Sequence, residues 1–121
     1  MKEERQRREK RGRDAEETAA RYLESIGFRI LERRLRTPAG EVDLVASGGD
    51  VLVFAEVKAR RSIGRGLFAL TDRQATRIAS AAECFLSGKV EYTNVMIRFD
   101  LVVVTPGNPP VHFPNAWQCD G

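Results

Sequence analysis

The segment VLVFAEV, residues 51–57, constrains the fold more than any other stretch of this sequence. Side chains alternate between the two faces of a strand, and here both faces are apolar until Glu56 is reached. Such a run is typical of a strand that is covered on both sides. A chain of 121 residues has room for one modest core. We therefore expect one central sheet with helices packed against it.

Two segments with helical periodicity flank the central strands. Residues 14–26 carry their apolar side chains on one helical stripe, and so do residues 71–87. Thr71 and Gln74 have the spacing of a capping box, which marks the start of the second helix.

Four further segments predict strands, and their connections predict how the strands pair. The early strands are joined by short connections and should be antiparallel, whereas the strand after the second helix can return parallel through a crossover. We therefore predict an α/β fold with a mixed central sheet and flanking helices. These four segments are residues 28–36, 40–46, 95–104 and 111–117.

Charged residues interrupt two of these strands. Glu56 and Lys58 share one face of their strand, and antiparallel pairing with the preceding strand can place Asp43 beside them. Two carboxylates at such a separation repel each other unless a cation lies between them. Mg²⁺ prefers oxygen ligands, and the main-chain carbonyl of Val57 can add one more. We expect a metal site formed by Asp43 and Glu56.

Such a site is suited to phosphodiester hydrolysis. A metal ion polarises a phosphoryl oxygen and lowers the pKa of a bound water, while Lys58 can stabilise charge on the phosphate or orient the water. The alternative is a pair of exposed strands with ion pairs between Lys58 and Asp43 or Glu56, worth about 0.2–1 kcal/mol each. The spacing alone leaves both interpretations open.

Glu16 is a candidate third carboxylate. It lies at the edge of the apolar stripe of the first helix, so its side chain is expected to face the sheet. The alternative is that Glu16 only complements the helix dipole in the first turn.

The charge of the chain indicates its partners and its location. A net charge of +3, supplied mostly by arginine, suits a partner with phosphates, although a solvated surface is the alternative. Residues 1–13 mix both signs of charge and predict a flexible arm or a helical extension, either solvated or touching nucleic acid. Neither a membrane span nor a secretory segment is recognisable, so we expect a cytoplasmic protein without a membrane partner.

Arg98 and Asp100 lie on one face of the strand predicted for residues 95–104. An intramolecular ion pair is expected there rather than a substrate contact. His112 is expected to be a packing residue of the C-terminal segment.

Several sequence pieces resemble the YraN family of small uncharacterised bacterial proteins. The pairing of GEVDLVA with FAEVKAR is the most specific piece, and GRDAEETAARYLESIGF, LTDRQATRIASAAECFL, IRFDLVVV and HFPNAW extend the resemblance over nearly the whole chain. The family is placed in the restriction-endonuclease-like superfamily, whose pattern is Asp followed by (Asp or Glu)-x-Lys. Its architecture is also similar to that of archaeal Holliday junction resolvases.

The resemblance implies a restriction-endonuclease-like core, with residues 14–121 forming a single nuclease-like domain. Asp43, Glu56 and Lys58 match the superfamily signature. Glu16 matches a glutamate that assists metal binding in related nucleases. Gln74 falls where some superfamily members carry a catalytic-site residue, with the capping box as the competing interpretation.

The function implied is metal-dependent cleavage of DNA, including branched or damaged DNA, with Mg²⁺ or Mn²⁺ as cofactor. By analogy with the resolvases, a homodimer is expected. The alternative is a nucleic-acid-binding or scaffold protein that retains the fold without turnover. The arginines expected to contact nucleic acid on one surface are Arg34, Arg36, Arg60, Arg61 and Arg73.

Overall fold

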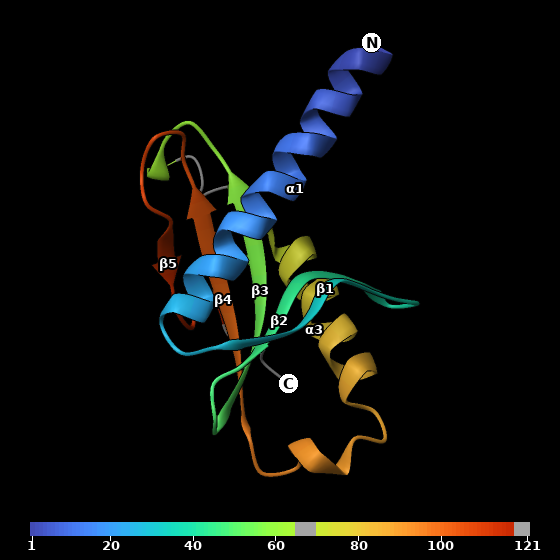
Figure 1. The fold of residues 1–121 in the computed structure, drawn as a ribbon. Helices are drawn as coiled ribbons and strands as arrows, with labels where there is room; N and C mark the ends of the chain where they lie inside the picture. The colour runs from blue at the N-terminus through green and yellow to red at the C-terminus, as the bar shows by residue number, and fades with distance from the viewer. Residues whose placement is uncertain (65–69, 118–121) are drawn as a thin grey trace.

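The computed structural model describes residues 1–64 and 70–117, which form helices packed on a single sheet (Figure 1). The helices are α1 (Lys2–Ser25), α3 (Asp72–Leu86) and the short 3-10 helix η1 (Val90–Tyr92). The strands are β1 (Arg29–Thr37), β2 (Gly40–Ser47), β3 (Val51–Ala59), β4 (Met96–Val104) and β5 (Val111–Phe113).

The sheet is mixed, as the connections predict. Its strand order is β1-β2-β3-β4-β5, the same as the order in the chain. The pairs β1–β2, β2–β3 and β4–β5 are antiparallel, whereas β3 and β4 are parallel. The chain between β3 and β4 contains α3, which supplies the crossover that a parallel pair requires.

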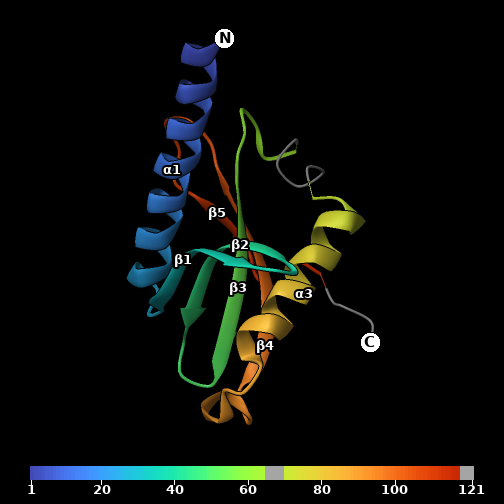
Figure 2. The same cartoon turned by 90° about the vertical axis from the view of Figure 1, so that its right-hand side faces the viewer.

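The two long helices cover opposite faces of the sheet (Figure 2). On the α1 face, Val53 and Ala55 of β3 are fully buried in a cluster with Leu23. On the α3 face, Leu52 and Phe54 of β3 are buried in a second cluster. Strand β3 is therefore covered on both sides, as its apolar run predicts.

Helix α1 is longer than its apolar stripe. Its buried residues lie between Ala15 and Leu23, yet the helix begins at Lys2. The structure thus shows the helical alternative for the charged N-terminal segment. These first turns extend past the sheet, and residues 2–11 are all exposed (Figure 1). Among the residues described, no helix is both long and apolar enough to cross a bilayer.

Candidate active site at the divergence of two strands

The candidate site lies where β2 and β3 stop pairing. Their paired residues run from Ser47 opposite Leu52 to Leu44 opposite Ala55. The next pair in this register would be Asp43 opposite Glu56. Instead, an oxygen of the Asp43 carboxyl group accepts a hydrogen bond of 2.8 Å from the backbone N–H of Val57. The side chain of Asp43 thereby satisfies a backbone donor at the point where β2 leaves β3.

Asp43 and Glu56 lie close enough to share a proton. Burial raises the pKa of Glu56 to about 9, assisted by its side-chain hydrogen bond with Asp43 and by the charge of Asp43. The charge of Lys58 acts in the opposite direction. At neutral pH Glu56 therefore keeps its proton, and its O–H can donate a hydrogen bond to Asp43. The predicted meeting of the two acids is observed.

A cavity of about 410 Å³ opens over this pair. Its walls include the β1–β2 turn (residues 37–40), both acids, and Gln74 and Arg77 of α3. A Cβ atom at Gly40 would lie 2.8 Å from the main-chain oxygen of Arg77. Glycine is thus required where the start of β2 approaches α3 and closes one side of the cavity.

Lys58 is half-buried two residues after Glu56 on β3. Its charge opposes the rise in the pKa of Glu56, so the ammonium group acts on the acid pair. None of the ion pairs between described residues includes Lys58. The alternative interpretation, in which Lys58 forms a close ion pair with Asp43 or Glu56, is therefore not observed in this part of the chain.

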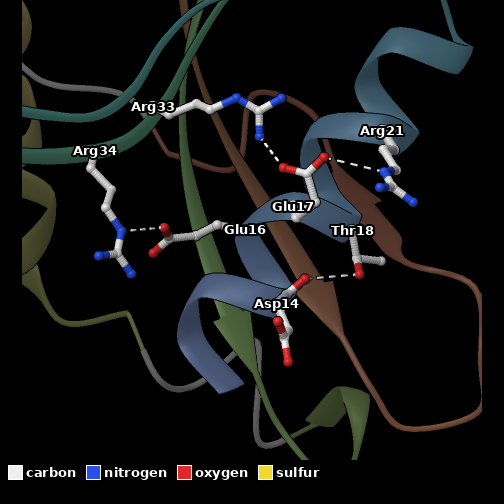
Figure 3. A network of polar contacts seen from close by, with 7 residues as sticks. All are labelled: Asp14, Glu16, Glu17, Thr18, Arg21, Arg33 and Arg34. Atoms are coloured by element: carbon white, nitrogen blue, oxygen red, sulfur yellow. Dashed lines mark hydrogen bonds and ion pairs between the residues drawn. The ribbon is translucent and has the colours of Figure 1, made fainter. Parts of the chain in front are cut away.

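Glu16 faces the sheet but has another partner. Its carboxylate accepts a hydrogen bond of 2.7 Å from Nε of Arg34, and Figure 3 shows the two side chains pointing toward one another. Glu16 and Asp43 both line a smaller hollow of about 210 Å³, which also includes Arg34. In residues 1–64 and 70–117, no three acidic, histidine or cysteine side chains are arranged to hold a metal ion. Of the three expected metal ligands Glu16, Asp43 and Glu56, only Asp43 and Glu56 lie together in the cavity.

Two consecutive arginines of β1 reach α1. Arg33 bonds Glu17, and Arg34 bonds Glu16, although neighbouring strand residues normally point to opposite faces (Figure 3). Arg34 has a φ of 52°, which breaks the alternation. The pKa of Glu17 is lowered chiefly by its hydrogen bond from Arg21. These contacts fix β1 to the helix.

Gln74 takes part in the capping box that its spacing predicts. Its Oε1 accepts a hydrogen bond of 3.0 Å from the Thr71 N–H, and its own N–H donates to the Thr71 hydroxyl oxygen at 3.1 Å. The same side chain also lines the cavity over the acid pair. Both interpretations of Gln74 therefore remain compatible with its position.

Arg77 is a site residue that the sequence interpretation missed. It lines the cavity together with Gln74, three residues earlier on α3. This helical spacing was the available signal, because residues three and four apart are neighbours on a helix surface.

The arginines expected to contact nucleic acid are dispersed. Arg34 pairs with Glu16, and Arg36 lies 3.6 Å from Glu41 in an exposed ion pair. Arg73 is exposed on α3. Intramolecular ion pairs thus engage two of these five arginines, and their contact with nucleic acid stays a prediction.

The remaining two expected contacts, Arg60 and Arg61, line a separate cavity of about 700 Å³ beside α1. This cavity lies at the ends of β3 and β4 and does not include the acid pair.

A second buried carboxylate belongs to β4 and is fully partnered. Asp100 accepts two hydrogen bonds of 2.8 Å from Arg98, one of 2.7 Å with His112, and one of 2.9 Å from the Asn115 N–H. His112 also contacts the Tyr22 hydroxyl at 3.3 Å. Burial alone would raise the pKa of Asp100, but these hydrogen bonds outweigh it and lower the pKa. The predicted Arg98–Asp100 pair is confirmed.

Fold and site together define a mixed α/β protein with two adjoining acids in a cavity between its central sheet and a helix. Residues 15–104 match the model of the uncharacterised protein family UPF0102, and the chain belongs to this family, which is the YraN family that its sequence pieces resemble.

Two relatives illustrate how much of the chain the family relationship covers. The UPF0102 protein RPA0323 of Rhodopseudomonas palustris is 44% identical over 107 residues, which cover 88% of this chain and 82% of the relative. The UPF0102 protein mlr4633 of Mesorhizobium japonicum is 45% identical over 113 residues, covering 93% and 90%.

Proposed function

We propose that this protein is a divalent-metal-dependent endonuclease that hydrolyses phosphodiester bonds in DNA, including branched or damaged DNA. The observation that carries the proposal is that Asp43 and Glu56 adjoin in one cavity, where the pKa of Glu56 is raised to about 9 against the opposing charge of Lys58. Their order also matches the signature of the restriction-endonuclease-like superfamily, which the YraN resemblance implies.

The acid pair has the chemistry of a magnesium or manganese site. Asp43 and Glu56 offer only oxygen donors, and Mg²⁺ in phosphate-processing sites is usually bound through one or two carboxylates together with water and substrate phosphate. A cation between the acids would replace the proton that Glu56 now retains. The carbonyl of Val57 is a further proposed ligand, and Glu16 would join only by leaving Arg34.

Each remaining residue has a proposed task during hydrolysis. A metal ion held by Asp43 and Glu56 would polarise a phosphoryl oxygen of the substrate and lower the pKa of a bound water. Lys58 stabilises the negative charge that develops on the phosphate oxygens. Gln74 already uses its Oε1 in the helix cap, so its NH₂ group is the part that can orient substrate. Arg73 and Arg77 add positive charge on the α3 side of the cavity.

A cleavage assay tests this proposal. The protein is incubated with Mg²⁺ or Mn²⁺ and with linear, nicked, flap and four-way DNA, and products are resolved on denaturing gels. Cleavage is expected for at least one substrate and is expected to disappear in Glu56→Gln and Lys58→Ala. Glu83→Gln, which neutralises an exposed acid on α3, is the matched control and should cleave like the unmodified chain.

A non-catalytic nucleic-acid-binding or scaffold role is the second candidate. The ion pair between Glu16 and Arg34 favours it, because it leaves two carboxylates rather than three at the site. DNA binding that is unchanged in Glu56→Gln, with cleavage of none of the substrates by the unmodified chain, would support this role and contradict the nuclease.

We also propose a homodimer, because a four-way junction presents two symmetric scissile bonds. Sedimentation with and without junction DNA tests it. A monomer under both conditions would contradict the dimer while leaving the cleavage proposal standing.

A further inference from the structure

The positive charge of this chain is concentrated in the first turns of α1. Residues 1–13 contain 7 of the 20 Lys and Arg and 3 of the 17 Asp and Glu, which gives a net charge of +4. The remaining residues contain 13 Lys and Arg and 14 Asp and Glu, which gives a net charge of −1. The basic character of the protein therefore belongs to the half of α1 that extends past the sheet.

This half of α1 has the features of an electrostatic contact surface. Residues 2–11 are exposed, and none of residues 2–13 is apolar. A helix without an apolar face has nothing to insert into a bilayer or to bury against a protein groove. In the described part of the chain, no ion pair engages the cations of residues 2–13.

A cavity with arginines on both walls lies at the base of this segment. It has a volume of about 700 Å³ and is lined by Arg11 and Asp14 of α1 and by Arg60 and Arg61 after β3. Three arginines and one aspartate thus contribute to its lining. Arg7, four residues before Arg11, continues the cavity-facing side of α1 by one turn.

We propose that this cavity and the adjoining side of α1 form a groove that binds the phosphate backbone of a nucleic-acid strand. Arginine favours phosphate because its planar fork can bond two oxygens. Arg7 and Arg11 are separated by about 6 Å along the helix axis, so they can follow successive phosphates.

Fluorescence anisotropy with a labelled DNA duplex in EDTA tests the groove without requiring cleavage. The test variant, Arg7→Gln with Arg11→Gln, removes two charges from the cavity-facing side. The control, Lys2→Gln with Arg13→Gln, removes two charges about half a turn round the same helix. Circular dichroism checks that both variants remain helical.

The test variant should reduce the slope of log affinity against log salt by about 2 and weaken binding about tenfold near 100 mM salt. In the control variant, the salt slope and the affinity should each change by less than half as much. Equal losses in the two variants would overturn the groove, because only the net charge would then matter. Tighter binding to anionic vesicles than to DNA, or no DNA binding at low salt, would also overturn it.

The same assay separates this inference from the proposed nuclease function. Glu56→Gln should bind DNA with an unchanged salt slope. If the unmodified chain cleaves no DNA but the test and control variants still differ in binding, the nuclease proposal fails and the groove stands.

Discussion

Asp100 and the Asp43–Glu56 pair are acids of the same sheet in opposite electrostatic conditions. Asp100 is fully buried, yet Arg98, His112 and a backbone N–H satisfy its oxygens, and its pKa is lowered. Glu56 is partly exposed to solvent, but its side-chain partner Asp43 is another acid, and its pKa is raised to about 9.

The difference teaches which acid is available for chemistry. A buried charge is tolerated when hydrogen bonds and opposite charges compensate it. Asp100 is compensated and joins β4, β5 and α1 through Arg98, His112 and Tyr22. In the Asp43–Glu56 pair, the Val57 N–H and the charge of Lys58 do not offset burial and the second acid. Glu56 therefore keeps a proton, which a cation can replace. Strongly shifted pKa values in a cavity are typical of functional sites.

The largest expected effect comes from removing the carboxylate of Asp100, which other residues hydrogen-bond and neutralise. Asp100→Ala leaves Arg98 and His112 without their partner and should lower the free energy of unfolding by about 3–5 kcal/mol. Urea unfolding measures this loss. Asp50→Ala, at an exposed position, should change it by less than about 0.5 kcal/mol. A loss below 1 kcal/mol in Asp100→Ala would remove the contrast between the two sites.

The second effect is the opposite pH dependence of the two sites. Glu56 binds its proton more tightly in the folded chain, so its contribution is fully present below the ordinary pKa of 4.5 and is lost as pH rises toward about 9. The free energy of unfolding should therefore fall as pH rises through this window. Asp100, with a lowered pKa, instead contributes stability that is lost as pH falls through its folded pKa.

Urea unfolding in EDTA at several pH values measures this dependence. Glu56→Gln should abolish the decline between pH 5 and 9 while leaving the acid-side loss caused by Asp100. An unchanged decline in Glu56→Gln would show that the acid pair does not share a proton.

Metal binding should produce a smaller, pH-dependent stabilisation. Mg²⁺ at tenfold excess over its dissociation constant should add about 1.4 kcal/mol, and the gain should grow with pH because binding displaces a proton. Thermal unfolding with and without Mg²⁺ measures it. Asp43→Asn and Glu56→Gln should lose this gain, and its persistence in both would place the cation elsewhere.

The smallest effect concerns the cap beside the cavity. Thr71→Ala should cost about 1 kcal/mol, because it leaves a helix N–H without its acceptor. Thr76→Ala, which removes another exposed hydroxyl of α3, should cost less than half of that. Chemical unfolding compares them. Equal costs would mean that the capping box contributes little to the position of Gln74.

The features that follow from local periodicity were predictable from the sequence. The two covered faces of β3 and the capping box depend on side-chain spacing within one element. The Arg98–Asp100 pair was predictable for the same reason, since its members are two residues apart on one strand. The parallel return after α3 depends on the length of the connection between the strands.

Other features depend on contacts between distant elements. Arg34 is 18 residues from Glu16, and it reaches this partner through a left-handed backbone conformation that no periodicity signals. The divergence of β2 from β3 depends on the Asp43 side chain bonding a backbone N–H. Arg77 enters the cavity wall because Gly40 allows a close approach to α3. These contacts exist only once the chain has folded.

The sheet keeps the order of the chain, and this affects the protein during its synthesis. The meander of β1, β2 and β3 ends at Ala59, so it can assemble on the ribosome before α3 has been made. Helix α3, whose Gln74 and Arg77 line the cavity over Glu56, is made only afterwards. The cavity over the acid pair is therefore completed by a part of the chain that emerges later than both acids.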